Sequence, residues 1–304
     1  MLYNNTTTFV KILSDVIDVD AGYTNFTVLT KDHKVYEFIQ KGAYLYRFDP
    51  QVDHVEKIAT QGHLRVDDIE STNDRQYTSY YVTQQNEIIQ NQMTIDYDRL
   101  HLYAQQDVNE IIKDIQEEGI IQTQTLLTDM DVQTICSIEN ATFVFTNQQQ
   151  LYAIGNNYID EDYGIFGVGE GVDSYSTFTL IPHGLNNIEK IYTTGPFALV
   201  IQTTSDFYYS GNIGYENSST FKRITEFGDI DQIIGGYYST IVLKDEIVYY
   251  IDYEDNNHLV RMYDNFIVQY VIKYLSLFLM VMTLFYLVVY FFEQNGKYNR
   301  YFKR

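Results

Sequence analysis

A hairpin pattern that recurs along the chain constrains the fold more than any other feature of the sequence. Each copy has an aliphatic anchor, a short spacer, a run rich in Val, Ile, Thr, Phe and Tyr, a polar turn and a second such run. Runs of this composition joined by short polar turns predict antiparallel β-hairpins. The anchors, spaced 42 to 66 residues apart, are Val19, Ile69, Ile135, Ile191 and Ile233.

Composition supports the same fold class, because the chain of 304 residues contains 30 Tyr and 18 Phe but no Trp. Aromatic and β-branched residues favour pleated, half-buried surfaces. A single small sheet cannot bury both of its faces, so hairpins at this spacing predict blades that stack on their neighbours. We therefore expect an all-β fold, a β-propeller-like array of about five to seven small antiparallel blades, with one C-terminal transmembrane α-helix.

The segment 151–182 resembles the regulator of chromosome condensation (RCC1-like) repeat family. It has an aromatic strand ending in Gly, then Asn, a loop with the spacing Gly-x-x-Gly-x-Gly, and a Pro before the next strand. Glycines at related positions follow two anchors or end a later hairpin strand. These repeat residues are Gly22, Gly155, Asn156, Gly164, Gly167, Gly169, Gly211 and Gly236.

The resemblance is specific over 130–252 and is lost over 90–130, where residues 111–122 form a short helix or belong to an insertion. The Trp that usually precedes the strand-end glycine of the family is replaced by Ile154 and Ser210. Five recognisable hairpins are also fewer than the seven blades typical of the family. The propeller is therefore smaller or incomplete, or the divergent stretch contains another blade.

Nineteen consecutive residues without a charge, 274–292, predict a transmembrane helix. At about 1.5 Å per residue this length nearly crosses a hydrocarbon core about 30 Å thick. We expect the helix over 266–292, with Tyr274, Leu279, Leu284 and Phe292 in the membrane, after an RCC1-like domain over 1–265. A short basic tail, 293–304, follows it.

Two cues about topology disagree. The first residues have neither a basic nor an apolar stretch of the kind found in a signal peptide, so a span near the C-terminus predicts a tail-anchored protein. Its domain would then be cytosolic, on an organelle such as one with a mitochondrial-type outer membrane. The basic tail favours the opposite orientation, with a lumenal or extracellular domain. Weak support for that alternative comes from the glycosylation sequons at Asn4, Asn5, Asn25, Asn140 and Asn217.

Charge restricts the partners. The chain carries 20 basic and 41 acidic side chains, of which 266–304 hold five and one, so the other residues have a net charge of −25. A domain this acidic is repelled by phosphate backbones, which excludes direct nucleic-acid binding. We expect a protein partner with a basic surface.

No motif indicates catalysis, a metal or a cofactor. The glycines of 164–171 are followed by no Lys and lie among acidic residues, so they predict close packing rather than phosphate binding. The six histidines lack zinc-ligand spacing, and the acidic runs at 160–162 and 252–255 lack a calcium-loop pattern. Cys136, the single cysteine, predicts a small buried side chain.

These observations predict a membrane-anchored interaction scaffold that binds a protein through its blade loops, at 156–180. The family resemblance implies an alternative, a regulator of guanine nucleotide exchange on a small GTPase. A lumenal or cell-surface receptor is a third possibility, which depends on topology.

Overall fold

The computed structural model describes residues 12–22, 24–41, 44–65, 74–102, 112–114, 121–157, 164–169, 171–194, 198–213, 217–225, 232–235, 239–244, 247–252 and 260–261. In this part of the chain the fold is all-β, as predicted, and consists of five small sheets. The predicted transmembrane segment lies outside the described residues. None of the helices among them is long and apolar enough to cross a membrane.

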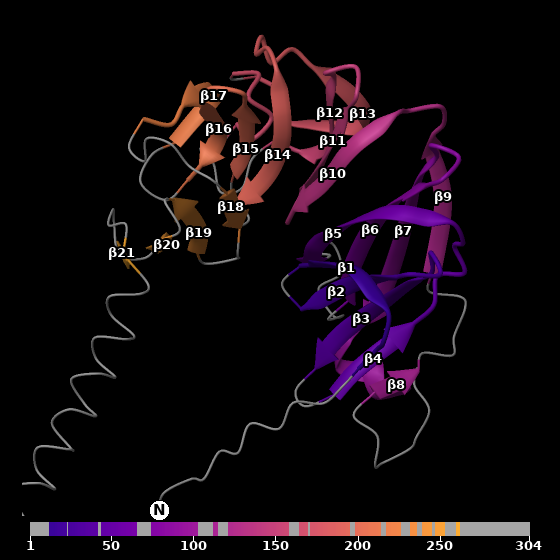
Figure 1. Cartoon of the computed structure of the whole chain (residues 1–304). Coiled ribbons are helices and arrows are strands. Elements are labelled where there is room, and N and C mark those ends of the chain that lie inside the picture. Colours follow the sequence, from indigo (N-terminus) through magenta and orange to yellow (C-terminus); the bar gives the residue numbers. More distant parts are fainter. Residues whose placement is uncertain are drawn as a thin grey trace, which may run out of the picture.

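The sheets follow one another in chain order along an arc (Figure 1). In each sheet the first strand lies along the inside of the arc, and the next strands pair with it as an antiparallel meander. The strands of the first two sheets are β1 (Val16–Ala21), β2 (Asn25–Thr30), β3 (Val35–Lys41), β4 (Tyr44–Phe48), β5 (Val55–Arg65), β6 (Asp74–Thr83), β7 (Ile88–Asp96) and β9 (Ile121–Leu127).

The last three sheets repeat this four-stranded order. Their strands are β10 (Val132–Ile138), β11 (Ala141–Thr146), β12 (Leu151–Asn156), β13 (Ser174–Ile181), β14 (Ile188–Thr194), β15 (Ala198–Thr203), β16 (Phe207–Asn212), β17 (Asn217–Arg223), β18 (Gln232–Gly235), β19 (Ser239–Lys244), β20 (Ile247–Asp252) and β21 (Val260–Arg261).

In its described residues, the divergent stretch contributes β7 and β9 to the second sheet and has an insertion between them. After β7 the chain forms a 3-10 helix, η1 (Tyr97–Leu102), and the strand β8 (Ile112–Asp114), which pairs in parallel with β4 of the first sheet. The chain then returns to the second sheet as β9. The short helix that we considered for 111–122 is therefore wrong at 112–114, where the backbone is a strand.

Side-chain contacts hold this insertion to both of the first two sheets. The Arg47 guanidinium, on β4 of the first sheet, donates to both carboxylate oxygens of Asp114, over 2.8 and 3.2 Å. Arg75, near the start of β6 in the second sheet, lies over the Tyr97 ring, 3.6 Å from its centroid. The insertion thus contacts both sheets.

Four of the predicted hairpins agree with the strand pairs β2–β3, β11–β12, β15–β16 and β19–β20. The fifth hairpin is also present as β6–β7, but its predicted anchor is wrong. The first strand of the second sheet is β5, and Ile58 within it occupies the anchor position. Ile69 lies outside the described residues, beyond the end of β5.

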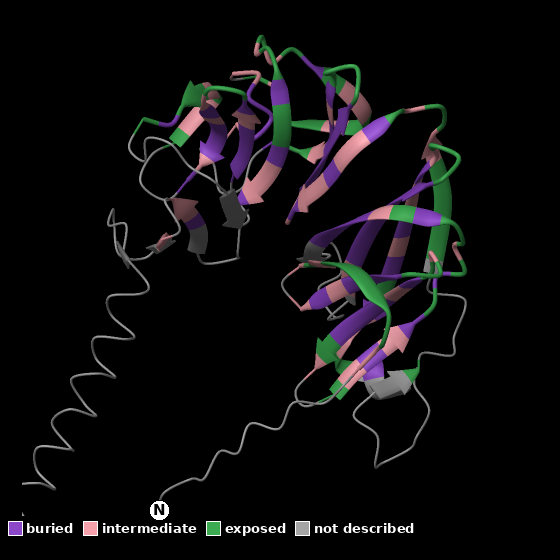
Figure 2. Cartoon of the chain, in the orientation of Figure 1, coloured by how far each residue is buried: buried purple, intermediate pink, exposed green. Residues whose placement is uncertain are grey.

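The hydrophobic core lies between the sheets, where apolar side chains from neighbouring sheets pack together. Figure 2 shows buried residues along the strands of these sheets. The largest cluster joins the third and fourth sheets and contains Phe143, Phe145 and Phe166, each with no exposed surface. Phe143 and Phe166 meet edge to face, with ring centroids 6.0 Å apart. Each sheet is therefore stabilised mainly by its neighbours, as in other repeat folds.

Candidate interaction surface

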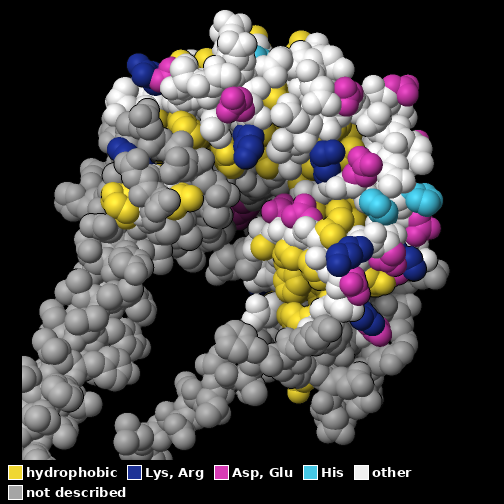
Figure 3. Space-filling view, in the orientation of Figure 1, with side chains coloured by type: hydrophobic (Ala, Val, Ile, Leu, Met, Phe, Trp, Pro, Cys, Tyr) yellow, Lys and Arg dark blue, Asp and Glu magenta, His cyan; other side chains and the backbone are white. Residues whose placement is uncertain are grey.

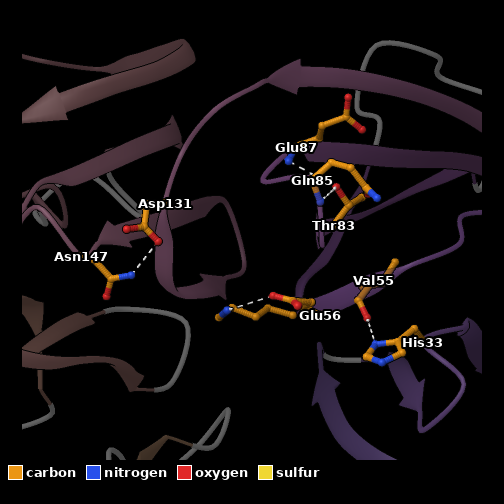
Figure 4. Close-up of polar contacts among 9 residues, drawn as sticks. His33, Val55, Glu56, Thr83, Gln85, Glu87, Asp131 and Asn147 are labelled. Atoms are coloured by element: carbon orange, nitrogen blue, oxygen red, sulfur yellow. Dashed lines mark hydrogen bonds and ion pairs between the residues drawn. The ribbon is translucent and has the colours of Figure 1, made fainter.

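Each sheet contacts the next through a set of interactions that recurs along the arc, which we call a joint. The polar part of a joint consists of hydrogen bonds from a hairpin turn to the first strand of the next sheet, and we call this part the clamp. The turn after β2 contains His33, whose carbonyl accepts from the Val55 N–H at 3.1 Å, while its Nδ1 lies 2.9 Å from the Val55 carbonyl (Figure 4). Gln149, in the turn after β11, holds Ile188 in a related way: its side-chain amide accepts from the Ile188 N–H at 2.8 Å and donates to the Ile188 carbonyl at 2.9 Å.

The turn residues of these clamps share one backbone conformation, which supports the equivalence. A third clamp is made by Asn86, whose carbonyl accepts from the Met130 N–H at 3.3 Å. His33, Asn86 and Gln149 all have φ near +60°. The first strands of four sheets share an irregularity: β1, β5, β10 and β14 all have a β-bulge after their first residue. A bulge strengthens local twist and fixes the register. The first strands of these four sheets are thus equivalent position by position.

The apolar half of the joint consists of two aliphatic anchors at the start of each first strand. Val55 and Ile58 pack on Leu29 and Val35 of the preceding sheet and are 0% and 4% exposed. In the next two joints the same positions pack on the middle strands of the preceding sheet. These anchors, 3–7% exposed, are Val132, Ile135, Ile188 and Ile191.

The first sheet has the two anchor residues, but no strands of a preceding sheet in the described part of the chain pack on them. Val16 and Val19 occupy the positions of Val55 and Ile58, yet they are 39% and 54% exposed. Ile17, between them, is 50% exposed. We call Val16, Ile17 and Val19 the open end. Figure 3 shows hydrophobic side chains at the surface of the first sheet, next to acidic ones.

Carboxylates surround the open end. Asp15 and Asp18 are exposed, and Asp15 forms a solvent-exposed ion pair with Lys31 at 3.7 Å. Asp20 points across to the second sheet, where its Oδ2 accepts from the Thr60 N–H at 2.6 Å. Desolvation raises the pKa of Asp20 to about 6, although the Thr60 hydrogen bond favours the charged form. The open end is thus an apolar strand face with an acidic border.

In its described residues, the glycine-rich loop of the predicted partner-binding stretch 156–180 contacts the fourth sheet. A Cβ at Gly164 would lie 2.8 Å from the Ser219 Cβ, and one at Gly167 would lie 2.4 Å from the Phe221 ring. Gly169 has φ +84°, and its N–H donates to the Ser219 carbonyl at 2.8 Å. The glycines therefore permit a close approach to β17, which joins the third sheet to the fourth.

Asn157, which sequence reasoning missed, organises this loop. Its side-chain amide donates to the Val172 carbonyl at 2.6 Å and accepts from the Phe166 N–H at 2.7 Å. The side chain is 3% exposed, whereas its neighbour Asn156 is exposed at the end of β12. The signal in the sequence was the pair of adjacent asparagines, of which we singled out Asn156 and overlooked Asn157.

The other predicted repeat residues lie at turns and strand ends. Gly155 and Gly211 end the third strands of two sheets with φ +109° and +88°, and Gly22 donates its N–H to the Asn25 carbonyl at 2.9 Å. Gly236 lies outside the described residues, as do Tyr274, Leu279, Leu284 and Phe292. The structure therefore does not bring the predicted residues together into one site.

A buried polar network fills the space between the first two sheets. Glu37 of β3 accepts hydrogen bonds from the Tyr81 hydroxyl and, at 3.1 Å, from the Asn91 amide. Burial raises the pKa of Glu37 to about 8, against the opposite effect of hydrogen bonds from Asn91 and Ser79. This carboxyl is 4% exposed, so it supports the sheet packing and cannot meet a ligand from solvent.

Two further features bear on chemistry. A pocket of about 350 Å³ lies beside the turn after β15, where Arg223 and Asp206 form an ion pair. Within the described ranges, no three His, Cys, Asp or Glu residues are placed to hold a metal ion. Neither feature resembles a catalytic constellation.

The sequons differ in accessibility. Asn25 is 6% exposed and donates its amide to the Gln61 carbonyl at 3.2 Å, so the folded domain hides this acceptor. Asn217 is exposed at the start of β17. Of these two acceptors, only Asn217 is available in the folded domain to a glycosylating enzyme.

Comparisons with known proteins support the fold. No protein-family model matches the sequence, and no curated protein is significantly similar to it. Among solved structures, human WBSCR16 aligns with a TM-score of 0.52 and 14% identity, over 80% of this chain and 64% of that one. Prp20p from Saccharomyces cerevisiae, the yeast RCC1, aligns with a TM-score of 0.52 and 13% identity, over 78% of this chain and 58% of that one.

These likenesses show an RCC1-like propeller fold and no more, because the identities are low. This chain spans less than two thirds of either solved structure. The family resemblance noted at 151–182 is therefore supported at the level of the fold.

Proposed function

We propose that this chain is a protein-interaction domain and that the open end is its principal docking surface. The supporting observation is the contrast between equivalent positions: anchors that are 0–7% exposed in the next three sheets are 39% and 54% exposed in the first. Exposed apolar surface that a repeat fold normally covers is a recognised mark of an interaction site. We therefore propose β1 as the docking surface, in addition to the loop at 156–180 that the sequence predicts.

The partner needs an apolar face for Val16 and Val19 and basic groups at its border. Asp15 and Asp18 flank the anchors, and the charge outside 266–304 is −25. Complementary charge at a rim accelerates association and is screened by salt. Binding of such a partner should therefore weaken as the ionic strength rises.

Substitution of an exposed anchor tests this proposal without disturbing the core. The full chain and its Val19→Lys variant are tagged and expressed in the cells in which the protein naturally occurs. Each is then purified with its bound partners at low and at high salt. A matched control is Leu180→Lys, because Leu180 is 50% exposed on β13, far along the chain from the open end. We expect a stoichiometric partner that Val19→Lys loses and Leu180→Lys retains; equal recovery with all three chains would refute the docking role of β1.

We further propose that 274–292 anchors the domain in a membrane, on the basis of its 19 uncharged residues. A tail-anchored topology places the domain in the cytosol. Protease treatment of sealed membranes, with a tag at each end of the chain, tests both points. Loss of the N-terminal tag supports a cytosolic domain, whereas protection together with a glycan at Asn217 indicates a lumenal one.

Regulation of a small GTPase is a second candidate, which the fold likeness to Prp20p favours. Prp20p binds Gsp1p and histones. Nucleotide release from purified small GTPases, measured with and without the full chain, tests this candidate. If the full chain accelerates nucleotide release and Val19→Lys abolishes this acceleration, the open end is the surface that binds the GTPase.

A further inference from the structure

We propose that the open end binds a two-stranded β-hairpin of a different protein, whose turn carries a side-chain amide or imidazole that hydrogen-bonds to the Val16 backbone. The inference rests on the proposed function, in that it names the structural class of the partner of the same β1 surface. It follows from the direction of the Val16 backbone and from the groups that bind the equivalent backbone in later sheets.

The first strands of four sheets begin with the same backbone geometry. In each, the residue just before the first anchor accepts a hydrogen bond from the N–H of the residue that follows the second strand. These donors and acceptors, 2.8–3.1 Å apart, are Lys31 with Asp15, Gln84 with His54, Asn147 with Asp131, and Thr204 with Asn187. β1 is therefore a formed strand with the same pairing as β5, β10 and β14, although no preceding sheet in the described part of the chain packs on it.

This pairing turns the backbone of the first anchor away from its own sheet. In an antiparallel ladder, residue pairs that exchange hydrogen bonds alternate with pairs that do not. The Lys31 N–H and the Asp15 carbonyl bond to each other next to the Val16–Thr30 pair, so Val16 directs its own N–H and carbonyl away from β2. These two groups lie at the open end, beside the exposed Val16 side chain.

In two later joints, the preceding sheet supplies partners for both of these backbone groups. The Val55 N–H donates to the His33 carbonyl, and the Val55 carbonyl contacts the His33 imidazole. The Ile188 N–H and carbonyl both bond to the side-chain amide of Gln149, which supplies an acceptor and a donor at once. Within the described residues, no turn occupies this place at Val16.

The turn that supplies the clamp belongs to the same hairpin that covers the apolar anchors. Leu29 and Val35, on either side of the first such turn, cover Val55 and Ile58. The β11–β12 hairpin, on either side of Gln149, packs on the anchors of β14 in the same way. One hairpin thus meets the polar and the apolar requirements of a joint together, and the open end presents the same two requirements to a partner.

Charge distinguishes this partner from the covering hairpins of the chain itself. Asp15 and Asp18 are exposed beside the anchors, and the ion pair of Asp15 with Lys31, at 3.7 Å, is open to solvent. Exposed ion pairs contribute little, so both carboxylates remain available to a partner. Because Asp15 directly precedes Val16, the hairpin carries Lys or Arg near its turn. This agrees with the basic partner that a net charge of −25 outside 266–304 favours.

A peptide copy of one covering hairpin tests the inference on the full chain, purified in a mild detergent. The probe contains residues 141–155, with its ends joined through a lysine-rich linker because an isolated hairpin is only marginally stable. Val144→Thr and Ile154→Thr make its second face polar, since these side chains pack towards the second sheet in the intact chain. The matched control peptide carries Gln149→Ala, which removes the clamp and keeps the apolar face. NMR establishes that both peptides are folded hairpins.

Calorimetry and hydrogen exchange then measure binding. We expect the probe to slow exchange in the segment that contains Val16, and to bind ~10-fold more tightly than the Gln149→Ala peptide, which lacks both clamp hydrogen bonds. Val19→Lys in the full chain should weaken binding of the probe ~10-fold or more, because it places a charge in an apolar contact. Leu180→Lys should leave binding unchanged, and a rise in ionic strength should weaken it.

Three results would overturn the inference: a folded probe that does not bind, equal binding by the two peptides, or exchange at Val16 that is already slow before the probe is added. The last would mean that this chain or a second copy covers its own open end. The outcome also separates the inference from the proposed function. If the probe fails but Val19→Lys still loses a cellular partner, the docking role of β1 stands. If Val19→Lys changes neither association, both fail.

Discussion

Glu37 should make the protein less stable as the pH rises, since its carboxyl is buried between the first two sheets and its pKa is raised from 4.5 to about 8. The folded chain then retains a proton that the unfolded chain loses above pH 4.5. Stability is fully present below pH 4.5 and is lost as the pH rises towards 8. At about 1.4 kcal/mol per pKa unit, the largest loss over this window is about 5 kcal/mol.

Asp20 contributes a change of the same sign at lower pH, because its pKa is raised from 3.8 to about 6. The interval from pH 6 to 8 therefore isolates Glu37. Over these two pH units the wild-type chain should lose up to about 3 kcal/mol of unfolding free energy. Urea denaturation of the full chain, followed by tyrosine fluorescence at pH 6, 7, 8 and 9, measures the loss.

The variant Glu37→Gln keeps the shape and the hydrogen-bonding capacity of the side chain but cannot ionise. We expect it to remove most of the decline between pH 6 and 8 and to be more stable than wild type at pH 9. Asp20→Asn is the control, because it should flatten the curve only below pH 6. A wild-type curve as steep as that of Glu37→Gln between pH 6 and 8 would refute a raised pKa at Glu37.

Three further predictions concern the third and fourth sheets, and unfolding experiments check each of them. Asn157→Ala should cost about 1–3 kcal/mol, because it removes one buried and one partly buried hydrogen bond, whereas the exposed neighbour Asn156→Ala should cost less than about 0.5 kcal/mol. Gly167→Ala should cost about 2–4 kcal/mol, because its Cβ meets the Phe221 ring; Gly171→Ala, also at positive φ but with open space around it, should cost about half as much. Burial raises the pKa of the Cys136 thiol, so a thiol reagent at pH 8 should modify it slowly until urea unfolds the chain; rapid labelling of the folded protein would contradict this.

The sequence predicted the hairpins well because their signal is local. Runs such as 142–146 and 151–155 alternate with polar turns, and the pairing β11–β12 follows from that pattern alone. The anchor of the second sheet was missed for the opposite reason. In β5 the anchor Ile58 lies between Lys57 and the buried Ala59 and Thr60, and an insertion separates the later strands β7 and β9.

The proposed interaction surface could not be predicted from the sequence, because the exposure of an anchor depends on which sheet comes before it. Val19 and Ile135 have the same place in the repeat, and among the described residues a preceding sheet covers Ile135 but not Val19. The glycines of 164–169 predict close packing, which the structure shows. That the element they pack against is β17 is a long-range property that no local pattern contains.

Photo-cross-linking from the open end tests the central claim most directly. A photoreactive phenylalanine analogue replaces Val19 in the full chain, in the cells that express it, and Leu180 in a control chain. If β1 is a docking surface, light should produce a discrete protein adduct from position 19 and none from position 180. Equal adducts at both positions, or none from position 19, would contradict a docking role for the first sheet.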